Sequence, residues 1–338
     1  MKQTVIIILV SVCLVACHPG KPVSYSTALD TASVASVTDA AMQWQMENYA
    51  RMQQIRWDGD NSWANGIYLT AAYEWGLLRH NAEMTDWVKE RAAKMQYEQG
   101  NSRYTSVYSA DNIIVSMLYA DMYDRDRDER VLHPSVARLQ FIVNNPSAVT
   151  SLRIDTADQN FTSKQRWAWC DALYMAPQVF ARYAVLWNDP SMLEFMDKEY
   201  HATTDYLLDT TYNFYYRDSN YFGKKEANGQ PVFWGRGQGW VIGGLARMIP
   251  YLPADWSGRQ YYVDLYKKMI DALVSVQSEA GNWYVTMLDP ESYPTPEMSS
   301  TGFITYALWW GINAGILDEA TYLEPATKGW QALVHAVQ

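Results

Sequence analysis

Two aspartates stand where the sequence predicts a helix to begin, and each has aromatic or polar neighbours. Asp171 follows two tryptophans, Trp167 and Trp169, and Asp111 follows the stretch Tyr108–Ala110. A carboxylate at a helix start can simply cap the helix, which is worth about 1 kcal/mol. It can also bind a polar ligand or transfer a proton. Either aspartate alone favours the cap, whereas the pair together favours a site.

A second group of candidate residues lies at 233–240, where Trp234, Arg236 and Trp240 alternate with three glycines. Glycine lets the backbone approach a ligand closely. The alternative is a tight turn with two core tryptophans and an arginine bound to loop carbonyls. A further stretch, 297–303, runs from polar residues to a glycine and has a helix cap as its alternative role.

The composition narrows the possible ligands. The chain of 338 residues has 49% hydrophobic and 19% charged residues, which excludes a disordered chain. It carries 15 Trp and 25 Tyr, an excess that suits stacking on sugar rings or a core built from large aromatics. The formal net charge is −10, with 27 Lys+Arg against 37 Asp+Glu and no basic block, which argues against a nucleic-acid partner.

These candidate residues must be positioned by helices, because apolar residues recur at helical spacing through most of the chain. The spacing predicts helices over 34–55, 65–79, 82–98, 111–123, 169–187, 190–208, 237–250, 259–277, 301–315 and 319–337. A weak repeat is visible, in which a polar or glycine-containing opening leads into an apolar helix and then a more charged one. The apolar helix of each pair is expected inside and its partner outside. In a closed ring the polar openings would meet at one rim.

Strands and metal sites have little support. Short strand candidates are 212–216 and 282–287. The acidic stretches 124–129 and 58–62 fail the calcium-loop pattern and are interpreted as solvated turns. The five histidines are scattered without zinc spacing. No metal or other cofactor is expected.

The first 17 residues predict a targeting segment. Lys2 precedes an apolar run at 5–10, and Leu14–Cys17 resembles a bacterial lipobox, in which Cys17 becomes the lipidated first residue. An ordinary signal peptide cut nearby is the alternative. Residues 18–33 are expected to be a tether, followed by a single catalytic domain at 34–338. The absence of an acidic residue directly after Cys17 favours the periplasmic side of the bacterial cell envelope, with membrane contact only through the lipid.

Cysteine usage agrees with this division. Cys13 and Cys17 both lie in the targeting segment, so the folded body holds only Cys170 and no internal disulfide is possible.

Three motifs together resemble a known family. They are WCDALYMA at 169–176, WGRGQGW at 234–240 and SSTGFITYAL at 299–308. The sequence resembles the unsaturated uronyl hydrolases of glycoside hydrolase families 88 and 105, and is nearer to 105, the unsaturated rhamnogalacturonyl hydrolases. The likeness runs from about Trp44 to the C-terminus. The resemblance implies an all-α fold, the (α/α)6 barrel, which agrees with the predicted helix pairs.

The resemblance also implies a reaction. Polysaccharide lyases leave a C4=C5 double bond on a terminal glucuronic or galacturonic acid. Protonation at C4 generates an oxocarbenium-like ion at C5, water adds there, and the hemiketal opens to expel the rest of the oligosaccharide. By resemblance Asp171 is the acid/base and Asp111 its carboxylate partner. A neighbouring carboxylate and desolvating indole rings both raise a carboxyl pKa, as a general acid requires.

The substrate-binding residues are carried over in the same way, with one departure. Trp234, Arg236 and Trp240 would line the sugar site, together with Trp167 and Trp169. The family usually has a His in a stretch that corresponds here to Phe214–Asp218, and Arg217 stands in its place. We therefore expect Arg217 to help hold the substrate carboxylate. A surface arginine paired with Asp218 is the alternative.

Two other functions remain compatible with the sequence. One is a conventional glycosidase that uses Asp171 and Asp111 on a saturated bond. The other is a lipid-tethered protein that binds glycans through its tryptophans without catalysis. The sequence predicts an oligosaccharide as the partner, but not its aglycone, and it does not predict the oligomeric state.

Overall fold

The computed structural model describes residues 24–56, 59–100, 107–157 and 162–337. In these ranges helices dominate and the strands are two residues long, so the all-α prediction is confirmed. No helix in the described part of the chain combines the length and apolar character needed to cross a bilayer. The elements are α1 (Thr31–Arg56), α2 (Trp63–Leu78), α3 (Ala82–Lys94), η1 (Ala110–Asn112), α4 (Ser116–Asp126), η2 (Glu129–Val131), α5 (His133–Asn144), η3 (Thr162–Gln165), α6 (Ala172–Met175), α7 (Pro177–Leu186), α8 (Pro190–Leu207), β1 (Leu208–Asp209), β2 (Phe214–Tyr215), η4 (Ser219–Tyr221), α9 (Gly235–Met248), η5 (Ile249–Tyr251), α10 (Arg259–Val274), α11 (Met298–Asn313) and α12 (Glu319–Ala336).

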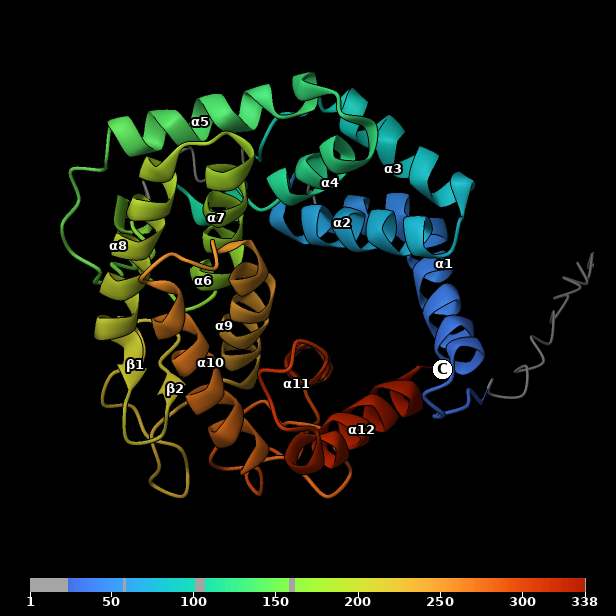
Figure 1. Ribbon diagram of the computed structural model, residues 1–338. Helices are drawn as coiled ribbons and strands as arrows, with labels where there is room; N and C mark the ends of the chain where they lie inside the picture. The colour runs from blue at the N-terminus through green and yellow to red at the C-terminus, as the bar shows by residue number, and fades with distance from the viewer. Residues whose placement is uncertain (1–23, 57–58, 101–106, 158–161, 338) are drawn as a thin grey trace, which may run out of the picture.

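The helices alternate between an inner and an outer position, as the repeat predicts. Figure 1 shows α3, α5, α8, α10 and α12 around the outside, with α2, α4, α7, α9 and α11 within. Residues of α7 are almost all buried, and so are most of α4 and α9, whereas α3, α8 and α10 bury one side. The helix α1 is an additional outer helix beside α2, to which Asp39 is joined by a hydrogen bond from Trp75 Nε1 of 2.8 Å.

Glycines in α9 allow the inner helices to approach closely. A Cβ atom at Gly243 would lie 2.8 Å from the ring of Phe303 on α11. A Cβ atom at Gly244 would lie 2.5 Å from the carbonyl oxygen of Leu173 on α6. Since real Cβ atoms do not approach neighbours so closely, glycine at these positions sets the distance between α9 and the helices on both sides. The motif at 234–240 is thereby fixed beside the motif at 169–176.

The structure differs from the predicted elements at several places. The helix expected over 111–123 is divided, because η1 ends at Asn112 and α4 begins at Ser116. The helix expected over 169–187 begins only at Ala172 and is divided by Pro177, because proline has no N–H for the helical hydrogen bond. Residues 282–287 form isolated bridges, such as Trp234 with Thr286, instead of a strand. The end of the predicted tether is helical, since Thr31 begins α1 and Asp30 caps it by accepting hydrogen bonds from the backbone N–H groups at 32 and 33.

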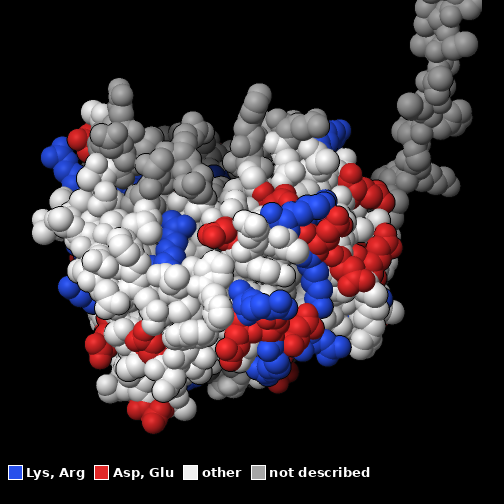
Figure 2. Space-filling model, turned by 90° about the horizontal axis from the view of Figure 1, so that it is seen from above, with Lys and Arg blue, Asp and Glu red and all other residues white. Residues whose placement is uncertain are grey.

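Charges of both signs are interspersed on the surface. Figure 2 shows acidic and basic side chains side by side on the face seen from above. The acidic stretch 124–129 follows this pattern, because Asp126 pairs with Lys89 at 2.6 Å and Asp128 with Arg130 at 2.6 Å. Surface pairs of this kind contribute about 0–1 kcal/mol each, so they add little to the stability of the fold.

Candidate active site

The carboxylate of Asp171 lies at the end of a short extended segment. The N–H of Cys170 donates to the carbonyl oxygen of Arg217 at 2.9 Å, and Trp169 forms a bridge with Asp218. Asp171 then occupies the N-cap position of α6, but its side chain makes no capping hydrogen bond. The Cys170 thiol lies 3.3 Å from Asp171 Oδ1 and donates to it. The structure therefore gives this carboxylate no capping role, which leaves it available for chemistry.

Asp111 is in a comparable position at the other side of the site. It lies in the single turn of η1, which no side chain caps, and η1 lies against α6. Burial raises the pKa of Asp111 to about 6; the positive charge of Lys164 opposes this rise and the negative charge of Asp171 adds to it. Burial also raises the pKa of Asp171, against the effect of the Arg217 charge. The two carboxyls thus form an electrostatically coupled pair that can hold a proton close to neutral pH.

Arg217 joins this pair to the rest of the site. Its guanidinium forms a short ion pair with Asp218, whose carboxylate is fully buried and also accepts from the N–H of Asn220 at 2.8 Å. The pairing with Asp218 was the alternative to a substrate contact. However, the Arg217 side chain is 34% exposed, and its charge lowers the pKa of both Asp111 and Asp171. Asp218 therefore orients a cation that faces the carboxyl pair.

A second cation comes from the start of α9. The guanidinium of Arg236 lies 4.0 Å from the centre of the Trp234 ring, and it pairs with Glu297 at 3.3 Å. Its charge also lowers the pKa of Asp171. Glu297 is held in turn, because it caps α11 by accepting from the N–H of Ser300 at 2.6 Å. The stretches at 234–240 and 297–303 thus meet at one arginine, and the structure shows the helix cap that was the alternative role of the second stretch.

Sequence reasoning missed Lys164, which lies in η3 before the Asp171 segment. Its Nζ lies 5.0 Å from the centre of the Trp169 ring, and its charge lowers the pKa of Asp111. No motif surrounds it in the sequence, and it comes near Asp111 only through the folding of the chain. The site therefore places Lys164, Arg217 and Arg236 around two carboxyls.

Three of the predicted sugar-stacking tryptophans are instead buried, which corrects that expectation. Trp167 and Trp169 are each 2% exposed, and Trp240 is 5% exposed. Trp240 packs against Trp63, Tyr174 and Phe303, with ring centroids 4.6–5.8 Å away. Since an indole that is covered in this way has no free face, the core interpretation holds for these three. Trp234 is the one of the four that is partly exposed.

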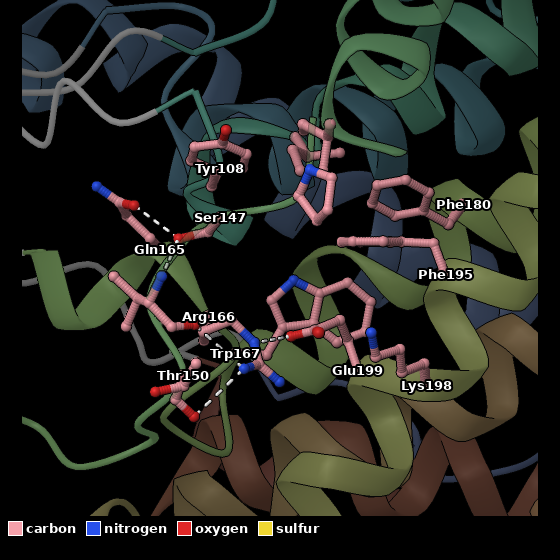
Figure 3. A pocket seen from close by; sticks show the side chains of 14 residues that line it. Tyr108, Ser147, Thr150, Gln165, Arg166, Trp167, Phe180, Phe195, Lys198 and Glu199 are labelled. Atoms are coloured by element: carbon pink, nitrogen blue, oxygen red, sulfur yellow. Dashed lines mark hydrogen bonds and ion pairs between the residues drawn. The ribbon is translucent and has the colours of Figure 1, made fainter. Parts of the chain in front are cut away.

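Trp167 lines a cavity whose wall does not include the two candidate carboxyls. Trp167 packs on Phe180 and Phe195 at a cavity of about 190 Å³, which also holds the Arg166–Glu199 ion pair (Figure 3). Neither Asp171 nor Asp111 lines this cavity.

A cavity of about 230 Å³ lies on the Arg217 side of the site. Arg217 and Trp234 form part of its wall. Among the described residues, no group of three or more His, Cys, Asp or Glu side chains is arranged to hold a metal ion. Cys17, the predicted lipidation site, lies outside the described residues.

Comparison with known proteins connects this geometry to an activity. Residues 37–338 match the model of Glycosyl Hydrolase Family 88. A relative from Alteromonas sp. (strain LOR), an unsaturated 3S-rhamnoglycuronyl hydrolase, is 32% identical over 316 residues, which cover 89% of this chain and 75% of the relative.

Solved structures share the fold. A glycosyl hydrolase family 88 protein from Bacteroides vulgatus superposes with a TM-score of 0.71 and 25% identity, over 86% of this chain and 84% of that one. A structure that is named a polysaccharide lyase superposes with a TM-score of 0.73 and 28% identity, over 88% and 83% of the two chains. Together with the observed helix pairs, these likenesses confirm the predicted fold class.

Proposed function

This chain belongs to Glycosyl Hydrolase Family 88 and is a glycosidase, and on that premise we propose that Asp171 and Asp111 are its catalytic pair. The enzyme removes a terminal 4,5-unsaturated uronic acid from oligosaccharides. The observation that supports the two residues is their shared geometry. Asp171 occupies the N-cap position of α6 without capping it, and Asp111 lies in the uncapped turn η1. Burial raises the pKa of both, and two cations act on each: Lys164 and Arg217 on Asp111, and Arg217 and Arg236 on Asp171.

The proposed chemistry begins with a proton on Asp171. The protonated carboxyl donates to C4 of the unsaturated uronide, which leaves positive charge at C5 and the ring oxygen. The resulting Asp171 carboxylate accepts a proton from a water molecule as its oxygen bonds to C5. One water is consumed in total, with hydrogen added at C4 and hydroxyl at C5. The hemiketal then opens and the aglycone leaves. The two carboxyls interact, because the negative charge of Asp171 raises the pKa of Asp111.

Arg217 and Arg236 are proposed to hold the substrate carboxylate on C5. A guanidinium binds a carboxylate through two parallel hydrogen bonds. Both arginines are already oriented by an acidic partner, Asp218 for one and Glu297 for the other, so little side-chain freedom is lost when the substrate binds. Their charges also make the ionised form of Asp171 accessible after proton transfer.

The aglycone is proposed to be a rhamnose, with or without sulfate. This proposal is supported by relatives named unsaturated 3S-rhamnoglycuronyl hydrolases, from Alteromonas and from Formosa agariphila, and by the partial exposure of Trp234 beside the carboxyl pair. A panel of unsaturated disaccharides with different aglycones would rank these substrates by kcat/KM.

The sign of an absorbance change tests the reaction. The C4=C5 double bond absorbs in the ultraviolet, so the hydrolase must make this absorbance fall when it is given an unsaturated disaccharide. A polysaccharide lyase would make the absorbance rise on an intact polysaccharide. Release of sugar only from saturated substrates would instead indicate a conventional glycosidase, and binding without turnover a glycan-binding protein. Asp171→Asn should abolish most of this fall, and Asp189→Asn is its matched control because Asp189 caps α8 and lies in neither candidate carboxyl position.

We also propose that Cys17 carries a lipid and attaches the enzyme to the periplasmic side of the cell envelope. The support is the lipobox-like sequence Leu14–Cys17 after an apolar run. Cys17→Ser should move the protein from the membrane fraction to the soluble fraction, with unchanged kcat on a soluble disaccharide. A protein that stays in the membrane fraction would contradict the lipid anchor.

A further inference from the structure

We propose that the 230 Å³ cavity beside Arg217 is the site of the aglycone sugar, and that Tyr293 and Glu226 determine which aglycone is accepted. The inference rests on the proposed function, because it assigns the part of the substrate that is released. The cavity lies between the segment that ends at the start of α9 and a loop that precedes α11. Its wall is formed by Arg217, Tyr221, Glu226, Val232, Trp234, Val285, Thr286 and Tyr293.

The cavity lies next to the carboxyl pair, because the two share Arg217. Arg217 belongs to both places, since it lines the cavity and its charge lowers the pKa of Asp171 and Asp111. The backbone of Arg217 is hydrogen-bonded to Cys170, the neighbour of Asp171, at 2.9 Å. A uronide at the carboxyl pair therefore has this cavity directly beside it. A second pyranose ring linked to the uronide is the ligand that can occupy both places.

The wall of the cavity is largely aromatic and aliphatic. Tyr221, Trp234 and Tyr293 present aromatic surface, and Val232 and Val285 present aliphatic surface. Tyr293 is 51% exposed and Val285 is 36% exposed. Apolar surface that is left open and rimmed by polar groups marks a binding site. A sugar ring with an apolar face, such as a 6-deoxyhexose with its methyl group, matches this wall.

Glu226 supplies the polar specificity. Its Oε1 accepts a hydrogen bond from the Thr286 hydroxyl at 2.6 Å, and its backbone N–H donates to the carbonyl oxygen of Gln230 at 2.8 Å. The turn between them is fastened by Asn228, whose side chain donates to the carbonyl oxygen of Leu288 at 2.8 Å. An ionised carboxylate offers about four acceptor positions and no donor. Glu226 therefore accepts hydrogen bonds from free hydroxyls of the aglycone and repels an anionic substituent close to it.

The test compares two substrates that differ only in the aglycone. One is an unsaturated uronyl-rhamnose disaccharide, and the other is the methyl glycoside of the same unsaturated uronic acid. We expect Tyr293→Ala to lower kcat/KM for the disaccharide about fivefold, which is about 1 kcal/mol of lost aromatic contact, and to leave the methyl glycoside unaffected. Tyr293→Phe keeps the ring and should keep the wild-type value. Since Tyr293 is 51% exposed, neither change removes a core side chain.

Glu226→Gln gives a second, independent measurement. A neutral acceptor is weaker than a charged one, so the disaccharide should again lose about fivefold in kcat/KM and the methyl glycoside nothing. Equal losses on both substrates, or no loss on the disaccharide, would overturn the aglycone site alone. If wild-type protein removes the double-bond absorbance of neither substrate, the proposed function fails and the aglycone site with it.

Discussion

Replacing Asp111 by Asn should make the protein more stable at neutral pH while it lowers turnover. In the folded protein the pKa of Asp111 is raised from its usual 3.8 to about 6, chiefly by burial. The folded state therefore binds this proton more tightly than the unfolded chain does. Its stabilising contribution is complete below pH 3.8 and is lost as the pH rises through 6. Asn is nearly isosteric and never ionises, so it avoids this loss.

The size of the effect follows from the same pKa. A pKa change of one unit corresponds to about 1.4 kcal/mol, so the rise from 3.8 to about 6 corresponds to about 3 kcal/mol. Since Asp111 is partly exposed, this is the upper figure. The free energy of unfolding of Asp111→Asn should match that of the wild type at pH 4 and below. It should exceed the wild-type value by up to about 3 kcal/mol at pH 7 and above.

Urea unfolding at pH 4, 5, 6, 7 and 8, followed by tryptophan fluorescence, measures this difference. Asp189→Asn is a control of opposite sign, because hydrogen bonds from Ser191 lower the pKa of Asp189. Its ionised form stabilises the fold at neutral pH, and that contribution is lost as the pH falls. The reasoning is refuted if Asp111→Asn is less stable than wild type at pH 7, or if the difference is the same at pH 4 and pH 7.

Further predictions concern the reaction and the fold. Asp171→Asn should keep the fold and the substrate affinity but lower kcat by about 10²–10⁴-fold, because an amide cannot protonate C4; more than a tenth of wild-type turnover would remove Asp171 from this role. Because the pKa of Asp171 is raised and its protonated form is the donor, kcat should fall as the pH rises through that pKa, and a kcat that rises across the same range would contradict it. Arg217→Ala should raise KM by roughly 10- to 100-fold, from the loss of a charged hydrogen bond of about 1.5–3 kcal/mol. It should raise KM less for a substrate whose carboxylate is a neutral ester. An unchanged KM on both substrates would leave Arg236 as the residue that holds the carboxylate. Gly235→Ala should lower the thermal midpoint of unfolding, since its Cβ would lie 2.2 Å from the carbonyl oxygen of Tyr284. Gly302→Ala has its nearest neighbour at 3.9 Å and should stabilise its helix by up to about 1 kcal/mol. Equal thermal midpoints for the two variants would contradict the close approach at Gly235.

The sequence by itself determined the helical fold and the places where the site could lie. The spacing of apolar residues predicts the helix pairs because a helix buries one stripe of its surface, and this information is local. The openings that contain Asp111, Asp171 and Arg236 could be located for the same reason. The break at Pro177 has a visible cause in the sequence, whereas the late start at Ala172 was less accessible because apolar residues precede it.

The tertiary structure alone decided which of these side chains face one another. Burial depends on contacts between segments far apart in the chain, so sequence could not distinguish the covered indoles of Trp167, Trp169 and Trp240 from the partly exposed Trp234. Lys164 acquires a role only because folding carries its charge near Asp111, 53 positions earlier in the chain. The raised pKa values have the same origin, because desolvation and Coulomb interactions depend on distances in space.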